Sequence, residues 1–341
     1  MKIGDTTAGY LQYLLDTAES LGADPDLVLQ DVGLDKTLLK DEEARIDLAY
    51  LMRIGFCAIQ RIQQPALGLI AGANSSITRF GMAGLAAMTA PTLKDALGII
   101  TQYEDLFGRC YRGSSTLVTD GSETWLKFYS IAPYNDYTYF VVDAILSGWT
   151  SSIQWLTGKS DLVESACIEF SPPAYQQAYQ QAFSCPVHFN QQENAIKLAA
   201  GALNVPILHR NDSLHRTLLE QCDIALGRVA LANSYRNKVL KVLGTMLHGK
   251  TPSIEEVALA LGMPTWTLRR KLKDENTSYQ NLVDEMRRDV ALSYMKNTEL
   301  SFGEISYLLG FSTPGAFQRA FKRWAGTTPG EYRKSLFNKH S

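Results

Sequence analysis

The stretch SFGEISYLLGFSTPGAFQRAFKRWAGTTPGEYR, residues 301–333, decides the fold of the C-terminal third of the chain. Ser301 and Glu304 form a Ser-x-x-Glu capping box, in which the serine oxygen accepts a backbone amide and the glutamate reaches back, so a helix begins here. The apolar stripe of that helix stops at Gly310, where a positive φ can turn the chain sharply. A basic helix then follows from Pro314. The stretch therefore predicts a helix-turn-helix.

The same pattern occurs once more, 48 residues upstream. Ser253 and Glu256 form the capping box, Gly262 ends the first helix, and residues 265–273 form the basic helix. A single copy is also typical of an ordinary pair of packed helices. Two capped units with a glycine turn favour a duplicated DNA-binding module instead.

The segment between the units, Ser278–Asn297, is predicted to be a connecting helix. Its apolar residues recur at helical spacing, and Arg287 and Arg288 are expected on its outer side. At 1.5 Å per residue such a helix is about 28 Å long, close to the ~34 Å between successive major-groove faces on one side of B-DNA. Both basic helices could then enter adjacent grooves. The apolar residues are Leu282, Val283, Met286, Val290, Leu292 and Met295.

Charge is divided unevenly along the 341 residues. Residues 1–230 contain 16 Lys and Arg against 25 Asp and Glu, a net charge of −9, whereas residues 231–341 contain 17 against 10, a net charge of +7. A basic C-terminal third on an acidic body is typical of a nucleic-acid-binding module joined to another domain. The length itself predicts about two domains.

The composition, 45% hydrophobic and 20% charged, is that of a soluble globular protein. No apolar run approaches the ~18 residues that cross a bilayer. Residues 1–20 carry Asp5, Asp16 and Glu19, whereas a signal peptide is continuously apolar. We therefore expect a cytoplasmic protein without a membrane partner.

The sequence lacks the common motifs of catalysis and metal binding. The five cysteines are far apart without a C-x-x-C pair, and the five histidines form no H-x-x-x-H array. No Walker loop, G-x-S-x-G elbow or G-x-G-x-x-G is present either. We expect no metal, no cofactor and no enzyme activity; a catalytic body fused to a DNA-binding module stays as an alternative.

Residues 310–333 resemble the signature of AraC/XylS-type transcription regulators. Leu268–Leu272, followed by Thr277–Tyr279, is similar to the first unit of the same family. The resemblance implies two helix-turn-helix units. It also implies that the second helix of the first unit makes most of the base contacts, while the second unit contributes more to positioning on phosphates.

Trp266, Arg269 and Arg270 share one face of the recognition helix of the first unit, opposite Leu268 and Leu272. Arginine can bind guanine O6 and N7 bidentately, which is worth ~1–3 kcal/mol against a wrong base. In the alternative interpretation Trp266 is a core aromatic and the arginines contact only phosphate. The candidate DNA-binding residues are Thr265, Trp266, Arg269, Arg270, Lys273, Thr313, Gln318, Arg319, Lys322 and Arg323.

The turn before this helix departs from the family pattern. Most members carry Ser-Pro there, whereas this chain has Met263-Pro264-Thr265. Because proline has no capping side chain, Thr265 is expected to be the N-cap. In the second unit Thr313 is the expected N-cap and Pro314 the first helical residue, and the small residues after Pro314 indicate a phosphate clamp.

The body is predicted to be a mixed α/β domain, so the fold class is α+β, with an all-α C-terminal domain of two helix-turn-helix units. Asp120-Gly121 is typical of a β-hairpin turn, and Thr92 with Asp95 caps a helix. The predicted boundaries are 1–225 for an effector-binding and dimerisation domain, 226–235 for a linker and 236–341 for the DNA-binding domain. The predicted helices are Tyr10–Leu21, Pro25–Gln30, Leu48–Ile62, Thr92–Phe107, Tyr139–Leu156 and Pro173–Ala182, and the predicted strands are Ser115–Val118, Trp125–Tyr129, Ala166–Phe170 and Val187–Phe189.

Three segments of the body resemble the effector domain of the ornithine-utilisation type of AraC regulators, which is classed as arabinose-binding-like. They are Gly81–Leu85, Pro91–Leu97 and Phe183–Ile196. The resemblance implies ligand sensing and dimerisation, whereas sugar binding does not follow from it.

The body also carries an aromatic cluster that is compatible with an effector pocket or with the core. In a pocket, Arg79, Arg109 or Arg112 would hold a carboxylate. The candidate ligand-binding residues are Arg79, Arg109, Trp149 and Trp155, and the cluster comprises Trp125, Phe128, Tyr129, Tyr134, Tyr137, Tyr139, Phe140, Trp149 and Trp155.

Together these features predict a sequence-specific DNA-binding transcription regulator whose body dimerises and senses a small molecule. The expected partners are double-stranded operator DNA, a second copy of the chain, the effector and RNA polymerase. A ligand-independent regulator, controlled only by its own concentration, is a second alternative, because a dimerising body needs no pocket.

Overall fold

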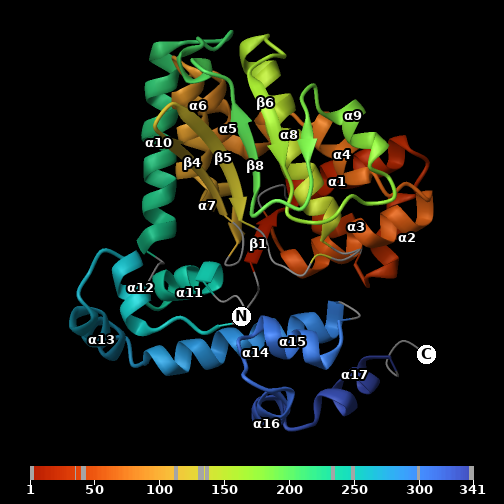
Figure 1. The fold of residues 1–341 in the computed structure, drawn as a ribbon, viewed down its shortest axis with the longest axis vertical. Coiled ribbons are helices and arrows are strands. Elements are labelled where there is room, and N and C mark those ends of the chain that lie inside the picture. Colours follow the sequence, from red (N-terminus) through yellow and green to blue (C-terminus); the bar gives the residue numbers. More distant parts are fainter. Residues whose placement is uncertain are drawn as a thin grey trace.

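The computed structural model describes residues 4–34, 36–39, 44–110, 114–129, 134, 138–231, 235–246, 250–297 and 300–337. An α+β body extends to the end of α10 (Asp212–Leu231), and helices alone follow from α11 (Tyr235–Met246). In Figure 1 the body lies above these C-terminal helices, and α10 runs down its edge toward α11. The α+β fold class is therefore confirmed.

The body contains a five-stranded sheet with the order β4-β5-β8-β6-β7. Its strands pair antiparallel except β6 and β7, which are parallel. The predicted hairpin is present: Asp120 pairs with Glu123 across a turn in which Gly121 has a φ of 58°. The strands are β4 (Ser114–Asp120), β5 (Glu123–Tyr129), β6 (Val163–Cys167), β7 (Val187–His188) and β8 (Asn194–Leu198).

A second, three-stranded antiparallel sheet has the order β2-β1-β3 and ties the N-terminus to the middle of the body. Its strands are β1 (Gly4–Thr7), β2 (Arg45–Asp47) and β3 (Gly108–Cys110). The hydroxyl of Thr6 donates to the carbonyl oxygen of Phe107 at 3.3 Å. The short strand β1 thereby lies beside α7, the helix that precedes β3.

The helices α6 and α8 pack on the five-stranded sheet. In the body, α4 packs along α8, and α5 packs against both α6 and α10. The helices of the body before α10 are α1 (Ala8–Ser20), α2 (Pro25–Asp31), α3 (Leu48–Ile62), α4 (Leu67–Ala73), α5 (Gly81–Met88), α6 (Leu93–Gln102), α7 (Glu104–Phe107), α8 (Tyr139–Thr157) and α9 (Gln177–Ala182), with 3-10 turns η1 (Lys36–Leu39), η2 (Ile77–Phe80) and η3 (Ala202–Asn204).

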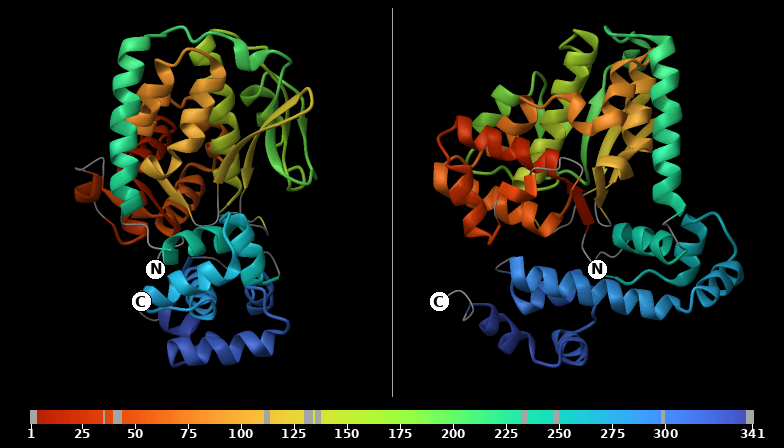
Figure 2. Two further views of the ribbon diagram at one scale, coloured as in Figure 1. Left: turned by 90° about the vertical axis from the view of Figure 1, so that its left-hand side faces the viewer. Right: turned by 180° about the vertical axis from the view of Figure 1, so that it is seen from behind.

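The C-terminal helices enclose an apolar core of their own, separate from the two cores of the body. Both predicted capping boxes are formed, and Gly262 and Gly310 have φ of 64° and 66°. One unit lies at each end of α14 (Figures 1 and 2). The helices are α12 (Ile254–Ala260), α13 (Thr265–Asp274), α14 (Tyr279–Asn297), α15 (Phe302–Leu308), α16 (Pro314–Ala325) and α17 (Pro329–Phe337).

One predicted helix of the body is in fact two. The sequence predicted a continuous helix over Thr92–Phe107, but α6 ends at Gln102 and α7 begins at Glu104. Between them Tyr103 is buried, and its hydroxyl donates to the carboxylate of Asp223 at 2.5 Å. The break lets Tyr103 reach α10 while α7 turns toward β3.

Two further boundaries differ from the prediction. The helix expected from Pro173 begins only at Gln177, and the strand expected over Ala166–Phe170 covers Val163–Cys167. In the second case the register is set by pairing with β8, a strand that the sequence did not indicate.

Candidate DNA interface and effector pocket

The first recognition helix, α13, begins directly after Pro264. The proline is the N-cap, with φ −63° and ψ 142°, and no side chain caps the helix. The expectation that Thr265 is the N-cap is therefore wrong. Because the ring fixes φ of Pro264 in a conformation that suits the residue before a helix, Thr265 already has helical geometry.

The two faces of α13 are clearly separated. Leu268 and Leu272 are fully buried, whereas Trp266 is 65% exposed and so is not a core residue. The guanidinium of Arg270 lies 5.5 Å from the centre of the Trp266 ring. Arg269 is exposed, 3.8 Å from Glu255, and Lys273 is exposed as well. This face of α13 exposes an aromatic ring and three cationic side chains to solvent.

The second recognition helix, α16, begins as the sequence predicts. The Thr313 hydroxyl accepts the N–H of Ala316 at 3.2 Å, and Pro314 is the first helical residue. Phe317 and Phe321 are fully buried. The polar face is exposed, and its residues are Gln318, Arg319, Lys322 and Arg323.

Arg323 is the one of these four that forms an ion pair in the described part of the chain, with Asp284 of α14 at 3.4 Å. At that exposed site the pair is worth little. The other side chains are available to an external partner.

Arg287 of α14 does not face outward, which corrects the prediction. Its guanidinium donates to the carbonyl oxygens of Leu309, at 2.9 Å, and Gly310, at 2.8 Å, and to the hydroxyl of Thr251. It also lies over the ring of Phe311. Burial lowers the pKa of this side chain. Arg287 therefore fastens the turn of the second unit to the connecting helix rather than contacting solvent.

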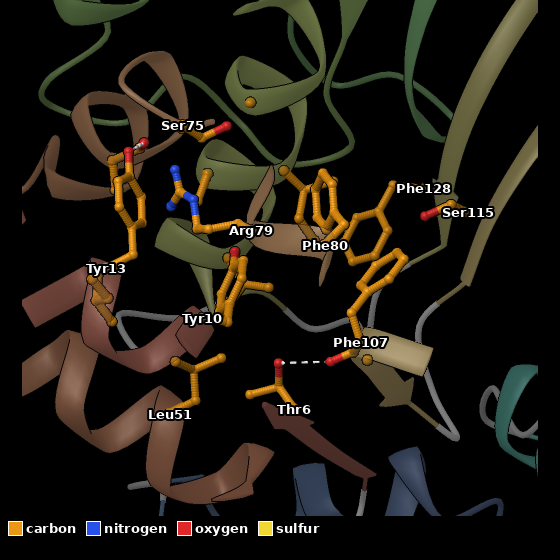
Figure 3. A pocket seen from close by; sticks show the side chains of 18 of the residues that line it. Thr6, Tyr10, Tyr13, Leu51, Ser75, Arg79, Phe80, Phe107, Ser115 and Phe128 are labelled. Carbon is orange, nitrogen blue, oxygen red and sulfur yellow. Dashed lines mark hydrogen bonds between the residues drawn. The ribbon is translucent and has the colours of Figure 1, made fainter. Parts of the chain in front are cut away.

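The body contains an apolar cavity of about 170 Å³ between α1, α3, α8 and η2. Figure 3 shows the guanidinium of Arg79 beside Tyr13 and Ser75, while the aromatic rings of Phe80, Phe107 and Phe128 gather on the other side. The remaining wall is mainly apolar and includes Leu14 of α1, Leu51 of α3 and Ile145 of α8. Such a wall favours a ligand with an apolar body.

Arg79 is the cation of this cavity. It is half-buried and lies over the Tyr13 ring. Within the described residues, no carboxylate lies at ion-pair distance from its guanidinium. Burial lowers its pKa. The guanidinium in this cavity therefore has no ion-pair partner among the described residues.

The helix α7 connects the cavity to the C-terminal helices. Glu104 lines the cavity, its carboxylate accepts the Ser115 hydroxyl at 2.7 Å, and burial raises its pKa to about 7. The next residue, Asp105, pairs with Lys241 of α11 at 2.8 Å. One short helix therefore contacts the cavity on one side and the DNA-binding part on the other.

The predicted ligand-binding residues are only partly brought together. Arg79 and Trp149 line the cavity. Trp155 is 44% exposed and packs against His209, away from the cavity. The side chain of Arg109, like Arg112 and Tyr137, lies outside the described residues.

Of the aromatic cluster, Phe128, Phe140 and Trp149 line the cavity, whereas Tyr134 and Tyr139 pack on Phe170 beside the main core. Sequence reasoning missed Tyr10, Tyr13, Glu104 and Phe107 of the cavity wall. No local pattern marks them, because they belong to elements far apart in the sequence.

Among the described helices, none combines the length and apolar character needed to cross a lipid bilayer. The described residues also contain no group of three or more His, Cys, Asp and Glu side chains placed to hold a metal ion.

Comparison with known proteins gives matches over both parts of the chain. The family model of the arabinose-binding domain of AraC transcription regulators, N-terminal, matches residues 22–207, and a helix-turn-helix domain matches residues 257–335. The ornithine utilization regulator of Pseudomonas aeruginosa is 24% identical over 326 residues, 96% of this chain and 95% of that protein.

Two further proteins of Pseudomonas aeruginosa are similar. The HTH-type transcriptional regulator VqsM is 27% identical over 274 residues, 79% of this chain and 84% of that protein. The crystal structure of the transcriptional regulator CdpR has 21% sequence identity and a TM-score of 0.42, over 85% of this chain and 98% of CdpR.

Proposed function

The chain belongs to the AraC family of transcription regulators, with an arabinose-binding-type N-terminal domain and a helix-turn-helix DNA-binding domain, and we propose that its body dimerises and senses a small molecule that controls DNA binding. The observation that carries the sensing proposal is the cavity, in which the charge of Arg79 has no counter-ion among the described residues.

DNA contacts are divided between the two units in this proposal. Arg269 and Arg270 of α13 read bases, because they are exposed beside Trp266 on the face opposite the core. Arg319 and Lys322 of α16 contact phosphates. Thr265, Lys273, Thr313, Gln318 and Arg323 complete the proposed interface.

The proposed domain boundaries stay at 1–225, 226–235 and 236–341. Since α10 continues to Leu231, the first six residues of the linker are helical. This helical part of the linker supports transmission of a change in the body toward the DNA-binding domain.

The route from cavity to DNA runs through α7 in this proposal. Ligand binding beside Glu104 and Phe107 changes the position of α7, and the Asp105–Lys241 pair transmits that change to α11. Such a ligand acts only if its affinity differs between the two arrangements of the domains.

Dimerisation is proposed to use the packed helices α5 and α10. Met82 and Leu85 lie three residues apart on α5 and are exposed, as is Ile224 of α10. Large apolar side chains of this kind are suited to an interface between two copies of the chain.

A thermal-shift screen of the full-length protein against a metabolite panel tests the sensing proposal. The panel includes ornithine, because a similar protein is named an ornithine utilization regulator. A ligand at 100 times its dissociation constant should stabilise the protein by ~2.7 kcal/mol. That compound should also change the affinity for operator DNA. If no compound stabilises the protein and DNA binding is insensitive to the whole panel, the regulator is ligand-independent.

A further inference from the structure

Two cavities meet at Arg79. The apolar cavity lies on one side, and on the other lies a more polar groove that reaches Asp105 and Ala225. Tyr13, Arg79, Phe80 and Phe107 line both. The guanidinium thus stands at the boundary between an apolar interior and a polar entrance.

The charge of Arg79 has no ion-pair partner among the described residues at this boundary. Tyr13 offers it only neutral groups, a ring beside the guanidinium and a hydroxyl that donates to the carbonyl oxygen of Ala71. Asp16 lines the polar groove and attracts Arg79 electrostatically, but from beyond ion-pair distance. Anion binding to a half-buried guanidinium of this kind is favourable, because the anion replaces interactions with water that the guanidinium lost on burial.

We infer that the apolar cavity binds a small monocarboxylate, with the carboxylate on Arg79 and the apolar body between α1, α3 and α8. The inference rests on the proposed sensing function and specifies its ligand class.

The volume of the cavity sets the size of the ligand. The cavity measures about 170 Å³. A cavity of about 150 Å³ in another protein takes up benzene. An apolar body of about six to eight carbons therefore fits.

The other charged groups of the wall limit the ligand to one negative charge and no positive one. Asp5 is paired with Arg45, and the carboxylate of Glu104 accepts both the hydroxyl and the N–H of Ser115. A second carboxylate near Glu104 would meet like charge. An ammonium group between Leu51 and Phe140 would lose its water to apolar side chains, and an ammonium group beside Arg79 would meet like charge.

Isothermal titration of the full-length protein with octanoate and with octanamide tests the ligand class. The two probes have the same chain, and only octanoate is charged. Octanoate should bind at least about tenfold more tightly, as expected for a hydrogen-bonded charge pair. Arg79→Gln should remove this preference, and the control Arg216→Gln, at an exposed site on α10, should retain it.

Arg79→Lys provides a second variant that keeps the charge. It should still prefer octanoate, but by a smaller factor, since lysine cannot bind a carboxylate bidentately. Folding of each variant is checked by circular dichroism before titration.

Equal binding of octanoate and octanamide to the wild-type protein would overturn the inference and leave sensing intact. An uncharged or cationic compound from the metabolite panel that stabilises the protein, with octanoate inert, would do the same. Insensitivity of the protein to every compound would count against the sensing function itself.

Discussion

Arg269 and Lys322 are both exposed cations on recognition helices, but their neighbours differ. Arg269 lies on α13 close to Trp266 and Arg270, whereas Lys322 lies on α16 after residues with little side chain, Gly315 and Ala316. We predict that Arg269→Ala makes the free energy of binding to the operator less favourable by ~1–3 kcal/mol. The loss on random DNA should be smaller. Lys322→Ala should weaken binding to all sequences alike.

Titrations over a range of salt concentrations check this division. Loss of one phosphate contact should reduce the slope of log K against log salt by about 0.9 for Lys322→Ala. Arg216→Ala on α10 should change neither property. Equal losses on operator and random DNA for Arg269→Ala would contradict base reading by that residue.

From the buried carboxyl group of Asp143 we predict that the stability of the protein depends on pH. Asp143 is fully buried on α8, accepts the Tyr175 hydroxyl at 2.8 Å and the Tyr179 hydroxyl, and burial raises its pKa to about 7 from 3.8. Because the folded state binds the proton more tightly, this contribution to stability is complete below pH ~4 and is lost as the pH rises through ~7. Asp143→Asn should make stability flatter over this window.

Urea unfolding of the full-length protein between pH 4 and 8 measures this effect. Glu104 titrates in the same range, since burial raises its pKa to about 7, so the variant should retain part of the pH dependence. An unchanged profile in Asp143→Asn would show that the charge of Asp143 costs no stability.

At the scale of single residues, the features that the sequence predicts best are those that depend on neighbouring side chains alone. The caps at Ser253, Ser301 and Thr313 depend on side chains three residues apart, and their hydrogen bonds are all present. The inward orientation of Arg287 was not predictable, because its acceptors belong to Leu309 and Gly310 of the second unit, which only the tertiary fold brings near.

Among the elements, the contact between α4 and α8 depends on glycine. A Cβ at Gly72 would overlap the Ser147 hydroxyl and the Ala144 carbonyl oxygen, whereas a Cβ at Gly98 of α6 would meet nothing within 4 Å. Gly72→Ala should therefore destabilise the body by ~1–3 kcal/mol through overpacking.

The matched variant Gly98→Ala should stabilise the protein by ~0.5–1 kcal/mol, because alanine favours a helix more than glycine does. Denaturant unfolding of the two variants measures both effects. Similar stability changes for Gly72→Ala and Gly98→Ala would show that α8 leaves room for a Cβ at position 72 of α4.

The short helix α7 gives a prediction about coupling. Lys241→Ala removes the ion pair with Asp105, so a ligand should still bind the body but should change DNA affinity less than in the wild-type protein. An exposed pair of this kind is worth up to ~1 kcal/mol, which limits the loss of coupling to about fivefold.

Operator binding with and without ligand measures the coupling. The control is Lys238→Ala on the same helix, whose ammonium group lies near the ring of Tyr235 rather than the body. If the ligand changes operator affinity equally in the wild-type protein and in Lys241→Ala, the coupling does not run through the Asp105–Lys241 pair.

Elements with a strong periodic pattern were predictable, and those set by long-range packing were not. The helices of the two units and the hairpin at Gly121 follow from caps, spacing and turn residues. The break at Tyr103 depends on Asp223, 120 residues away, and strand β8 is defined by its neighbours β5 and β6. For the same reason only part of the cavity wall was predictable, Arg79 and Trp149 among it, since the wall combines residues from α1, η2, α7 and α8.

At the scale of the whole molecule, the distribution of charge and the arrangement of the helices both favour DNA binding by the C-terminal domain. The net charge of +7 on residues 231–341 provides affinity for DNA that decreases with salt, while the body carries −9. Two units lie at the ends of the 19-residue helix α14, and we propose that they give two points of contact on one duplex. We propose that this arrangement reads two adjacent sites under the control of the body.

Selection of bound sequences from a random duplex library by the full-length protein, near physiological salt, tests this proposal. The predicted result is a motif with two half-elements about one helical turn, ~10 base pairs, apart. Enrichment of a single short element, or failure of both the full-length protein and residues 231–341 to enrich any sequence, would contradict it.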